Sequence, residues 1–102
     1  MDNEITVIEL KQRLDNGEKL LVIDVREPYE YDEFNIGARL IPLGNLPVEL
    51  HDLEEYVDNE IIVHCRSGAR SAAAQDYMRK QGFEKVRNLS GGILAWQQAF
   101  QG

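Results

Sequence analysis

The chain has 102 residues, of which 43% are hydrophobic and 28% charged, values that are ordinary for a soluble globular domain. Eighteen acidic and 11 basic residues give a formal charge of −7, which argues against an electrostatic attraction to nucleic acid or to an anionic membrane. We therefore expect one domain over residues 1–102, with no nucleic-acid partner and no membrane partner.

Three features bear on the location of the protein in the cell. The longest apolar run, Leu20 to Ile23, is far shorter than the roughly 20 residues of a membrane-spanning helix. The N-terminus, Met1-Asp2-Asn3-Glu4, lacks the basic and apolar regions of a secretory signal. A single cysteine excludes an internal disulfide, which suits a reducing compartment. We expect a cytoplasmic protein.

A capped helix is expected close to the N-terminus. Thr6 and Glu9 have the spacing of a capping box, in which the hydroxyl accepts from a first-turn amide and the glutamate reaches back. The helix should continue through Leu10 and Leu14 and stop near Gly17.

Strand and helix patterns then alternate along the chain. Residues 20–25 and 60–64 are nearly continuous apolar runs rich in β-branched side chains, which predict strands buried on both faces. The other predicted segments are a short helix from Pro28 to Phe34, a short strand over 40–42, a helix over 46–53, a helix over 71–81 with Gly82 as its left-handed cap, a short strand over 86–89, a turn at 91–92 and a closing helix over 93–100. This alternation implies a mostly parallel sheet with helices on both faces.

The one cysteine, Cys65, directly follows the predicted strand over 60–64. In parallel α/β folds, ligands bind outside the carboxyl ends of the strands. Cys65 is therefore predicted to lie at the edge of the sheet where such ligands bind.

The residues after Cys65, Arg66-Ser67-Gly68-Ala69-Arg70, must turn from a strand into a helix within a few positions. A loop that tight points several backbone N–H groups at one spot, with the positive end of the helix dipole behind them, and Gly68 permits a positive φ. Such surroundings lower the pKa of a thiol from about 8.5 into the range of roughly 3.5 to 7.5. We therefore predict a reactive Cys65 thiolate near neutral pH, which requires a sulfur that is not sealed from solvent.

A plainer interpretation is that Cys65 is a small apolar residue filling the end of a buried strand. On that interpretation, the polar residues that follow Cys65 form an ordinary solvated loop. Periodicity and spacing do not decide between the two.

Three segments of the chain resemble the rhodanese family of sulfurtransferases. CRSGARS (65–71) is similar to the active-site loop of the family, LLVIDVREPYEY (20–31) to its Asp-Val-Arg-Glu segment, and GFEKVRNLSGGILAW (82–96) to its closing Asn-Leu-x-Gly-Gly-x-x-x-Trp pattern. The segments occur in the family's order and the likeness covers nearly the whole chain. It implies a single rhodanese domain of the α/β class, a five-stranded, mostly parallel sheet with helices on both faces.

The resemblance also implies a two-step sulfur transfer. The cysteine takes a sulfane sulfur from a small anionic donor such as thiosulfate, becomes a persulfide, and passes the sulfur to cyanide or to a thiol, with a sulfur-relay protein as a further candidate partner. By position, Cys65 is the catalytic nucleophile. The implied substrate-binding residues are Arg66, Ser67, Gly68, Ala69, Arg70 and Ser71. No metal or cofactor is implied.

Two alternatives to this activity remain. One is a persulfide carrier for a protein partner, with little thiosulfate activity, which would need the same loop. The other is a phosphatase, which the loop length disfavours: cysteine-based phosphatases have five residues between cysteine and arginine, whereas Cys65 and Arg70 have four. The shorter ring of amides suits one sulfur atom and crowds a phosphoryl group.

One segment departs from the family pattern. The usual Gly-His-Ile-x-Gly-Ala stretch appears here as residues 34–38, Phe-Asn-Ile-Gly-Ala, one residue shorter and without the histidine. This leaves the local turn open and could reshape one rim of the pocket.

Other polar residues have a structural interpretation. Asp24 and Arg26 are expected to form a buried structural ion pair, with a catalytic pair as the alternative. His64 should pack or face solvent, because neighbours along a strand point to opposite faces. For Ser71 we favour a helix cap over a bond to the sulfur. The remaining assignments are His51 on the surface, Trp96 in the core, and solvated faces for the glutamates at 27, 30, 33, 54 and 55.

Overall fold

A computed structural model describes residues 3–100 of the protein; Met1 and Asp2, named above for the N-terminal sequence, lie outside the described residues. Its five strands are β1 (Glu4–Ile5), β2 (Leu21–Asp24), β3 (Arg39–Leu40), β4 (Ile61–His64) and β5 (Val86–Leu89). Its helices are α1 (Val7–Asp15), α2 (Pro28–Glu33), α3 (Leu46–Glu49), α4 (Ala69–Lys80) and α5 (Gly92–Phe100), with the 3-10 helices η1 (Leu43–Asn45) and η2 (Leu50–Tyr56). Every strand pairing is parallel, in the order β1-β5-β4-β2-β3.

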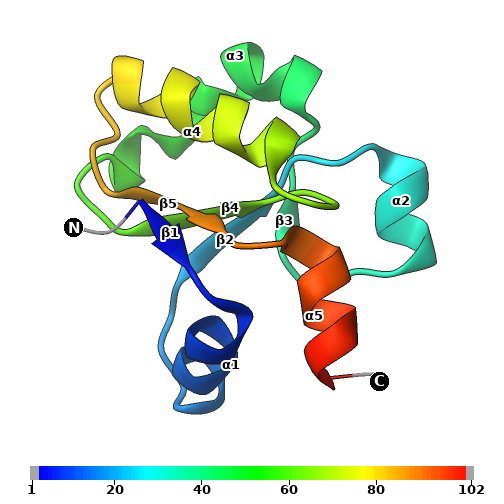
Figure 1. Ribbon diagram of the computed structural model, residues 1–102. Helices are drawn as coiled ribbons and strands as arrows, with labels where there is room; N and C mark the ends of the chain where they lie inside the picture. The colour runs from blue at the N-terminus through cyan, green and yellow to red at the C-terminus, as the bar shows by residue number, and fades with distance from the viewer. Residues whose placement is uncertain (1–2, 101–102) are drawn as a thin grey trace.

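Helices cover both faces of this sheet, as predicted (Figure 1). α3 and α4 lie on one face, and α1 and α5 lie on the other. The core is accordingly divided in two: Ile61 and Val63 of β4 face the first layer, whereas Ile62 between them faces the second. Because both faces of β4 are covered, the strand is apolar at successive positions instead of alternating with polar residues.

The N-terminal elements follow the sequence pattern in part. Thr6 caps α1 as expected, with its hydroxyl oxygen accepting from the Glu9 amide at 3.1 Å. The Glu9 carboxylate reaches across to Arg87 at 3.2 Å, a contact that a capping box does not predict. β1, which no sequence pattern indicated, adds to the edge of β5, with Glu4 opposite Asn88.

The topology puts the carboxyl ends of β2 and β4 at a switch point. The chain continues from β2 outward to β3 on one side and from β4 outward to β5 on the other. In open parallel sheets, the crevice at such a point is where ligands bind. Cys65 is the first residue after β4 and therefore lies at this crevice.

The shortened segment over residues 34–38 is closed by local hydrogen bonds. The Asn35 side chain donates to the Tyr31 carbonyl at 3.0 Å and accepts from the Gly37 amide at 2.9 Å. Gly37 has a φ of +81°, and the Tyr31 hydroxyl donates to the carbonyl of the buried Ala38 at 2.8 Å. Asn35 and Gly37 thus determine the turn that the sequence left open. Within residues 3–100, no helix is both long and apolar enough to cross a membrane.

Candidate active site

A tight loop carries Cys65 from the end of β4 to the first turn of α4. Gly68 is the N-cap of α4 and has a φ of +119°, a left-handed conformation that side chains rarely adopt. The turn directs donors at one atom: Cys65 Sγ accepts from the Gly68 amide at 3.1 Å, from the Ser71 amide at 3.4 Å and from the Ser71 hydroxyl at 3.3 Å. Of the six residues that the resemblance implies for substrate binding, Gly68 and Ser71 donate these three hydrogen bonds.

The donors lower the pKa of the thiol. Burial raises the pKa of Cys65, but hydrogen bonds from the Ser71 hydroxyl and from the amides of Ser71, Gly68 and Ser67 outweigh it. The pKa of Cys65 therefore lies below its ordinary value, because the thiolate accepts hydrogen bonds that a neutral thiol accepts more weakly. This direction agrees with the loop argument from the sequence.

Cys65 is less exposed to solvent than a reactive thiolate was expected to be. Cys65 is 1% exposed. Beyond it, Arg66, Ser67 and Ala69 are exposed, and Gly68 and Arg70 are partly so. Cys65 itself is therefore nearly closed to solvent, although the loop that follows it lies on the surface.

Ser71 does not cap α4, which begins two residues earlier than predicted. Its buried hydroxyl has one proton and lies near three acceptors: Asn88 Oδ1 at 2.6 Å, the Gly68 carbonyl at 3.2 Å and Cys65 Sγ at 3.3 Å. The expectation of a helix cap is wrong because Gly68, which tolerates a left-handed φ, ends the loop first. Ser71 instead belongs to the surroundings of the sulfur.

Asn88 of β5 is a site residue that the sequence reasoning missed. Its amide donates to the Gly68 carbonyl at 3.1 Å while its oxygen accepts from Ser71, so it ties both to the sheet. The one available indication was its place in the Asn-Leu-x-Gly-Gly pattern. Nothing local to Asn88 points to a loop 17 residues away.

The start of α5 supports the loop from the other side. The amides of Ile93 and Leu94 donate to the carbonyls of Cys65 and Arg66 at 3.0 and 3.1 Å. Gly92 makes this approach possible: a Cβ atom there would lie 2.5 Å from the Cys65 carbonyl oxygen and 2.6 Å from that of Arg66. The predicted turn at 91–92 is therefore also a close packing point.

Arg66 and Arg70, both among the implied substrate-binding residues, differ in their surroundings. Arg70 forms a bidentate pair with Glu30 of α2, at 2.6 and 2.9 Å. The solvated face expected for Glu30 is therefore wrong: its side chain is 12% exposed, whereas the other glutamates of that group are exposed. Within residues 3–100 the Arg66 side chain forms no hydrogen bond or ion pair, and it lines a cavity of about 130 Å³ between α2 and α5.

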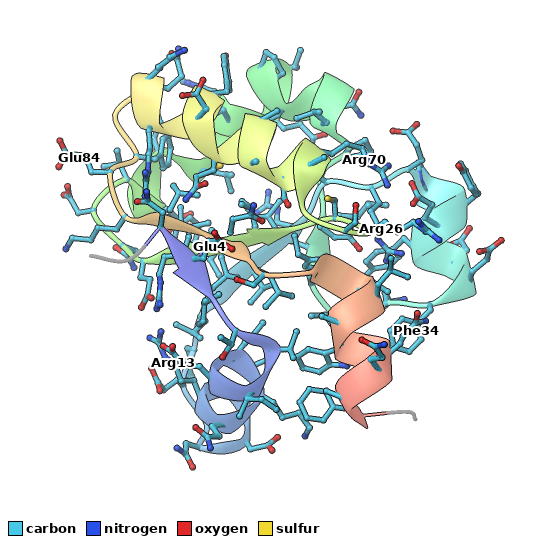
Figure 2. The ribbon with its side chains drawn as sticks, in the orientation of Figure 1. Glu4, Arg13, Arg26, Phe34, Arg70 and Glu84 are labelled. Carbon is cyan, nitrogen blue, oxygen red and sulfur yellow. The ribbon has the colours of Figure 1, made fainter. Side chains whose placement is uncertain are left out.

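Asp24 and Arg26 form the expected structural ion pair. Arg26 Nη2 lies 2.8 Å from Asp24 Oδ2, and both residues are buried. The same guanidinium donates to the Phe34 carbonyl at 2.7 Å, which ties the segment after α2 to the end of β2. Figure 2 shows Arg26 and Arg70 on the side of the molecule occupied by α2.

His64 packs in the interior, one of the two expected outcomes. It is 0% exposed, and its ring nitrogens have no hydrogen-bond partner in the described part of the chain. Burial lowers the pKa of His64, so the ring is neutral at pH 7. His51, by contrast, lies on the surface, and Trp96 packs against the core and the Phe100 ring.

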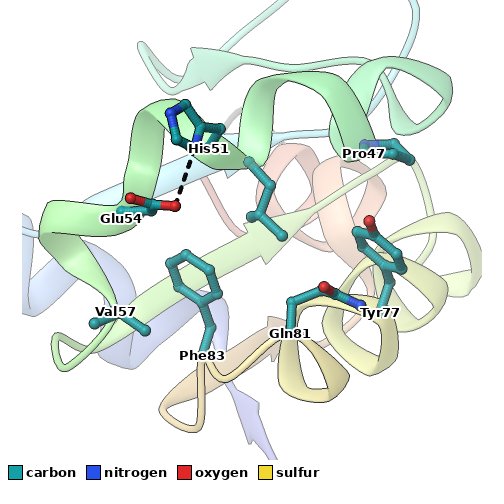
Figure 3. A pocket seen from close by; sticks show the side chains of 8 residues that line it. Pro47, His51, Glu54, Val57, Tyr77, Gln81 and Phe83 are labelled. Atoms are coloured by element: carbon teal, nitrogen blue, oxygen red, sulfur yellow. Dashed lines mark hydrogen bonds and ion pairs between the residues drawn. The ribbon is translucent and has the colours of Figure 1, made fainter.

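A larger cavity lies away from the cysteine loop. It has a volume of about 520 Å³ and opens between η2 and the C-terminal part of α4, with an ion pair between His51 and Glu54 (Figure 3). Its lining residues are Pro47, Leu50, His51, Glu54, Val57, Tyr77, Gln81 and Phe83. We place the site at Cys65, because three donors converge there on a nucleophilic atom.

The fold and the site define a parallel α/β domain with a cysteine in an amide-lined loop at the end of its central strand. The chain belongs to the rhodanese-like domain family, whose model matches residues 6–99. This confirms the family resemblance drawn from the three segments.

Individual proteins agree with this assignment. A sulfurtransferase of Allochromatium vinosum is 39% identical over 94% of this chain and 89% of that protein. The Bacillus subtilis protein YrkF, described by name as a sulfur carrier, is 42% identical over 91% of this chain and 50% of that protein. A crystal structure of a rhodanese-like domain protein from Staphylococcus aureus matches with a TM-score of 0.84 at 29% identity, over 93% of this chain and 91% of that one.

Proposed function

We propose that the protein is a rhodanese-type sulfurtransferase that carries sulfur on Cys65 as a persulfide. The observation behind the proposal is the convergence of the Gly68 amide, the Ser71 amide and the Ser71 hydroxyl on one sulfur atom. These donors stabilise the negative charge on Sγ of the attacking thiolate; in the persulfide that forms, the charge lies on the outer sulfur, which is bonded to Sγ and so stays beside the same donors.

The first step, with thiosulfate as donor, is a displacement at sulfur. The Cys65 thiolate attacks the outer sulfur of S–SO₃²⁻, the S–S bond of the donor breaks, and sulfite, SO₃²⁻, leaves with the bonding electron pair. Cys65 becomes Cys–S–S⁻. No proton, metal or oxidant is needed, since the three negative charges before the step are carried by the persulfide and sulfite after it.

The second step returns the enzyme to its starting state. Cyanide attacks the outer sulfur of Cys–S–S⁻, the S–S bond of the persulfide breaks, and thiocyanate leaves. A thiolate acceptor, RS⁻, attacks in the same way and leaves as RSS⁻. In either case Cys65 recovers its thiolate, which the loop amides again stabilise.

The residues of the loop divide the work between them. Backbone amides of the loop hold the sulfur, and Arg66, exposed and unpaired within residues 3–100, attracts an anionic donor. Because Cys65 is 1% exposed, the donor enters as the exposed loop side chains move aside. Cytoplasmic residence, predicted from the sequence, fits a reactive thiol that must stay reduced.

Intact-mass measurement tests the proposal. Incubation with thiosulfate should add one sulfur atom to the protein, and cyanide should remove it and release thiocyanate. Cys65→Ser should abolish both, whereas Ala73→Ser, which adds a hydroxyl at an exposed position of α4, should change neither. Loading of the Cys65→Ser variant would refute the proposal.

The second candidate is a persulfide carrier that serves a protein partner. Its specific support is the 42% identity to YrkF. Rapid loading from a persulfidated protein together with slow loading from thiosulfate would favour the carrier; the reverse order would favour the enzyme acting on thiosulfate. Rapid hydrolysis of an aryl phosphate would contradict both and indicate a phosphatase instead.

A further inference from the structure

The Arg70 side chain is neutralised by a carboxylate from another element. Glu30 of α2 receives both terminal nitrogens of Arg70, at 2.6 and 2.9 Å, across 40 positions of sequence. The Glu30 side chain is 12% exposed and that of Arg70 is 36% exposed, so water screens the pair from the Arg70 side only. The hydrogen bond from Arg70 lowers the pKa of Glu30 to about 2, and the carboxylate is therefore charged throughout the neutral range.

Glu30 is held in place by contacts that do not involve Arg70. The Glu27 amide donates to Glu30 Oε1 at 3.1 Å. The Arg26 guanidinium bonds the backbone carbonyls of Glu30, at 3.4 Å, and of Phe34, at 2.7 Å, and Arg26 is itself paired with the buried Asp24. The part of α2 that carries Glu30 is thus tied to the end of β2. The carboxylate is presented to Arg70 by a fixed support.

Arg70 directly precedes Ser71, whose amide and hydroxyl donate to Cys65 Sγ at 3.4 and 3.3 Å, and its guanidinium interacts weakly with the charge on Cys65. A free guanidinium at this place would attract anions to the sulfur, in proportion to their charge. Paired with Glu30, Arg70 contributes little net positive field, and a donor that needs the guanidinium must displace a carboxylate that fits it bidentately. An anionic donor therefore meets an obstacle that a neutral donor does not.

We propose that Glu30 determines donor specificity: by holding Arg70, it selects against doubly charged donors such as thiosulfate and in favour of a thiol persulfide, which reacts in its protonated, uncharged form, R–S–SH. The inference rests on the proposed function, since donor choice presupposes that Cys65 takes up sulfur. In the favoured step, Cys–S⁻ attacks the outer sulfur of R–S–SH, and the S–S bond of the donor breaks. The outer sulfur gives its proton to the leaving thiolate, so the products are Cys–S–S⁻ and R–SH.

The size of the effect follows from Coulomb's law. The removal of one unit charge near the cysteine loop, in surroundings between water and protein interior, changes the local concentration of a singly charged anion about threefold to tenfold. For a doubly charged anion, the same change acts twice and reaches about tenfold or more. A neutral reagent is unaffected.

The experiment compares Glu30→Gln with Asp32→Asn. Both changes remove one carboxylate from α2, but Asp32 is exposed, forms no ion pair within residues 3–100 and, unlike Glu33, does not line the cavity beside Arg66. We expect Glu30→Gln to raise the rate of Cys65 loading by thiosulfate about tenfold relative to loading by a persulfide prepared from a small uncharged thiol. Asp32→Asn should change this ratio less than twofold. An unchanged or lowered ratio in Glu30→Gln overturns the inference.

A second measurement separates this inference from the proposed function. Iodoacetate and iodoacetamide have similar shapes and alkylate thiolates, but only the former is charged, so the ratio of their rates reports the field at Cys65 without any sulfur transfer. Glu30→Gln should raise the iodoacetate-to-iodoacetamide ratio about threefold or more, and Arg70→Ala should cancel that rise in the double variant. A failure to load sulfur with a raised ratio would refute only the proposed function, and normal loading with an unchanged ratio would refute only this inference.

Glu30→Asp provides a second test of the inference if the Glu30→Gln variant folds poorly. It keeps the charge but is one methylene shorter, so its contact with Arg70 is weakened without being abolished. Its alkylation ratio should fall between those of the native protein and Glu30→Gln. A ratio equal to that of the native protein, in a variant whose thermal unfolding shows an intact fold, would also count against the inference.

Discussion

At the scale of single residues, the reactivity of Cys65 reflects burial opposed by hydrogen bonds. Burial favours the neutral thiol, whereas donors from Ser71, Gly68 and Ser67 favour the thiolate and prevail. The Ser71 hydroxyl is the donor whose contribution can vary, because it has one proton and can donate it either to Cys65 Sγ or to the nearer Asn88 oxygen. Backbone amides have no such alternative.

Replacement of Ser71 tests how much of its hydroxyl proton the sulfur receives. The rate of Cys65 alkylation by iodoacetamide should rise with pH through a midpoint below that of free cysteine, since only the thiolate reacts. Ser71→Ala should move this midpoint to higher pH by roughly one unit, because a donor to the thiolate is lost. Ser90→Ala, whose hydroxyl bonds Glu4 instead, is the matched control. An unmoved midpoint in Ser71→Ala would place the proton on Asn88.

The sequence indicated the cysteine and its amide loop, but not the contacts that come from distant positions. The amide loop at Cys65 could be predicted because the arginines and the glycine that form it directly follow the cysteine in the sequence, where a strand turns into a helix. The pairing of Arg70 with Glu30 and the bonds of Ser71 to Asn88 join residues 40 and 17 positions apart. Such contacts are set by how α2 and β5 dock, which no local pattern encodes.

At the scale of elements, burial on both faces made β2 and β4 visible in the sequence, and both were predicted to within two residues at each end. β1 was missed because two residues are too few to show a period, and the strand exists by pairing with β5. α4 begins at Ala69 and not at Ser71, since Gly68 takes the left-handed cap. The hydrophobic pattern thus predicted whether a segment is a helix or a strand. The exact ends of each element depend on the geometry of the turns beside it.

The contact between α5 and the cysteine loop gives a prediction at this scale. Gly92→Ala puts a Cβ at a φ of +56° and within 2.6 Å of two loop carbonyl oxygens, so the loop must shift. We expect the free energy of unfolding to fall by about 2 to 4 kcal/mol and Cys65 alkylation to lose its low midpoint.

Gly44→Ala is the control for that change. No atom lies within 4 Å of the site of its added Cβ. Urea denaturation of both variants, with alkylation measured on the folded protein, gives the comparison. A Gly92→Ala protein as stable and as reactive as Gly44→Ala would show that α5 does not constrain the loop.

At the scale of the whole molecule, a cluster of charged residues joins several elements. It lies at the amino end of β4, whereas Cys65 lies at the carboxyl end. Glu60, just before β4, pairs with Arg13 of α1 at 2.6 Å and with Arg87 of β5 at 3.0 Å. The hydrogen bond from Arg13, followed by that from Arg87, lowers the pKa of Glu60 to about 2 against the cost of burial. The cluster links the N-terminal helix to two strands.

This cluster predicts a pH dependence of stability. Because the folded-state pKa of Glu60 is depressed, its contribution is present above the unfolded pKa near 4.5 and is lost as the pH falls toward 2. Glu60→Gln should therefore lower the free energy of unfolding by about 1 to 3 kcal/mol at pH 7, and the difference should vanish near pH 2. Glu84→Gln, at an exposed position, should change little at either pH. Equal stabilities of the two variants at pH 7 would contradict the prediction.

The hydrogen bonds from Ile93 and Leu94 to the loop carbonyls bear on when the cysteine loop is completed. During ribosomal synthesis, Cys65 emerges almost 30 residues before these two amides. Until α5 docks, the carbonyls of Cys65 and Arg66 lack these two hydrogen bonds, so the geometry of the cysteine loop is completed only when this helix is in place.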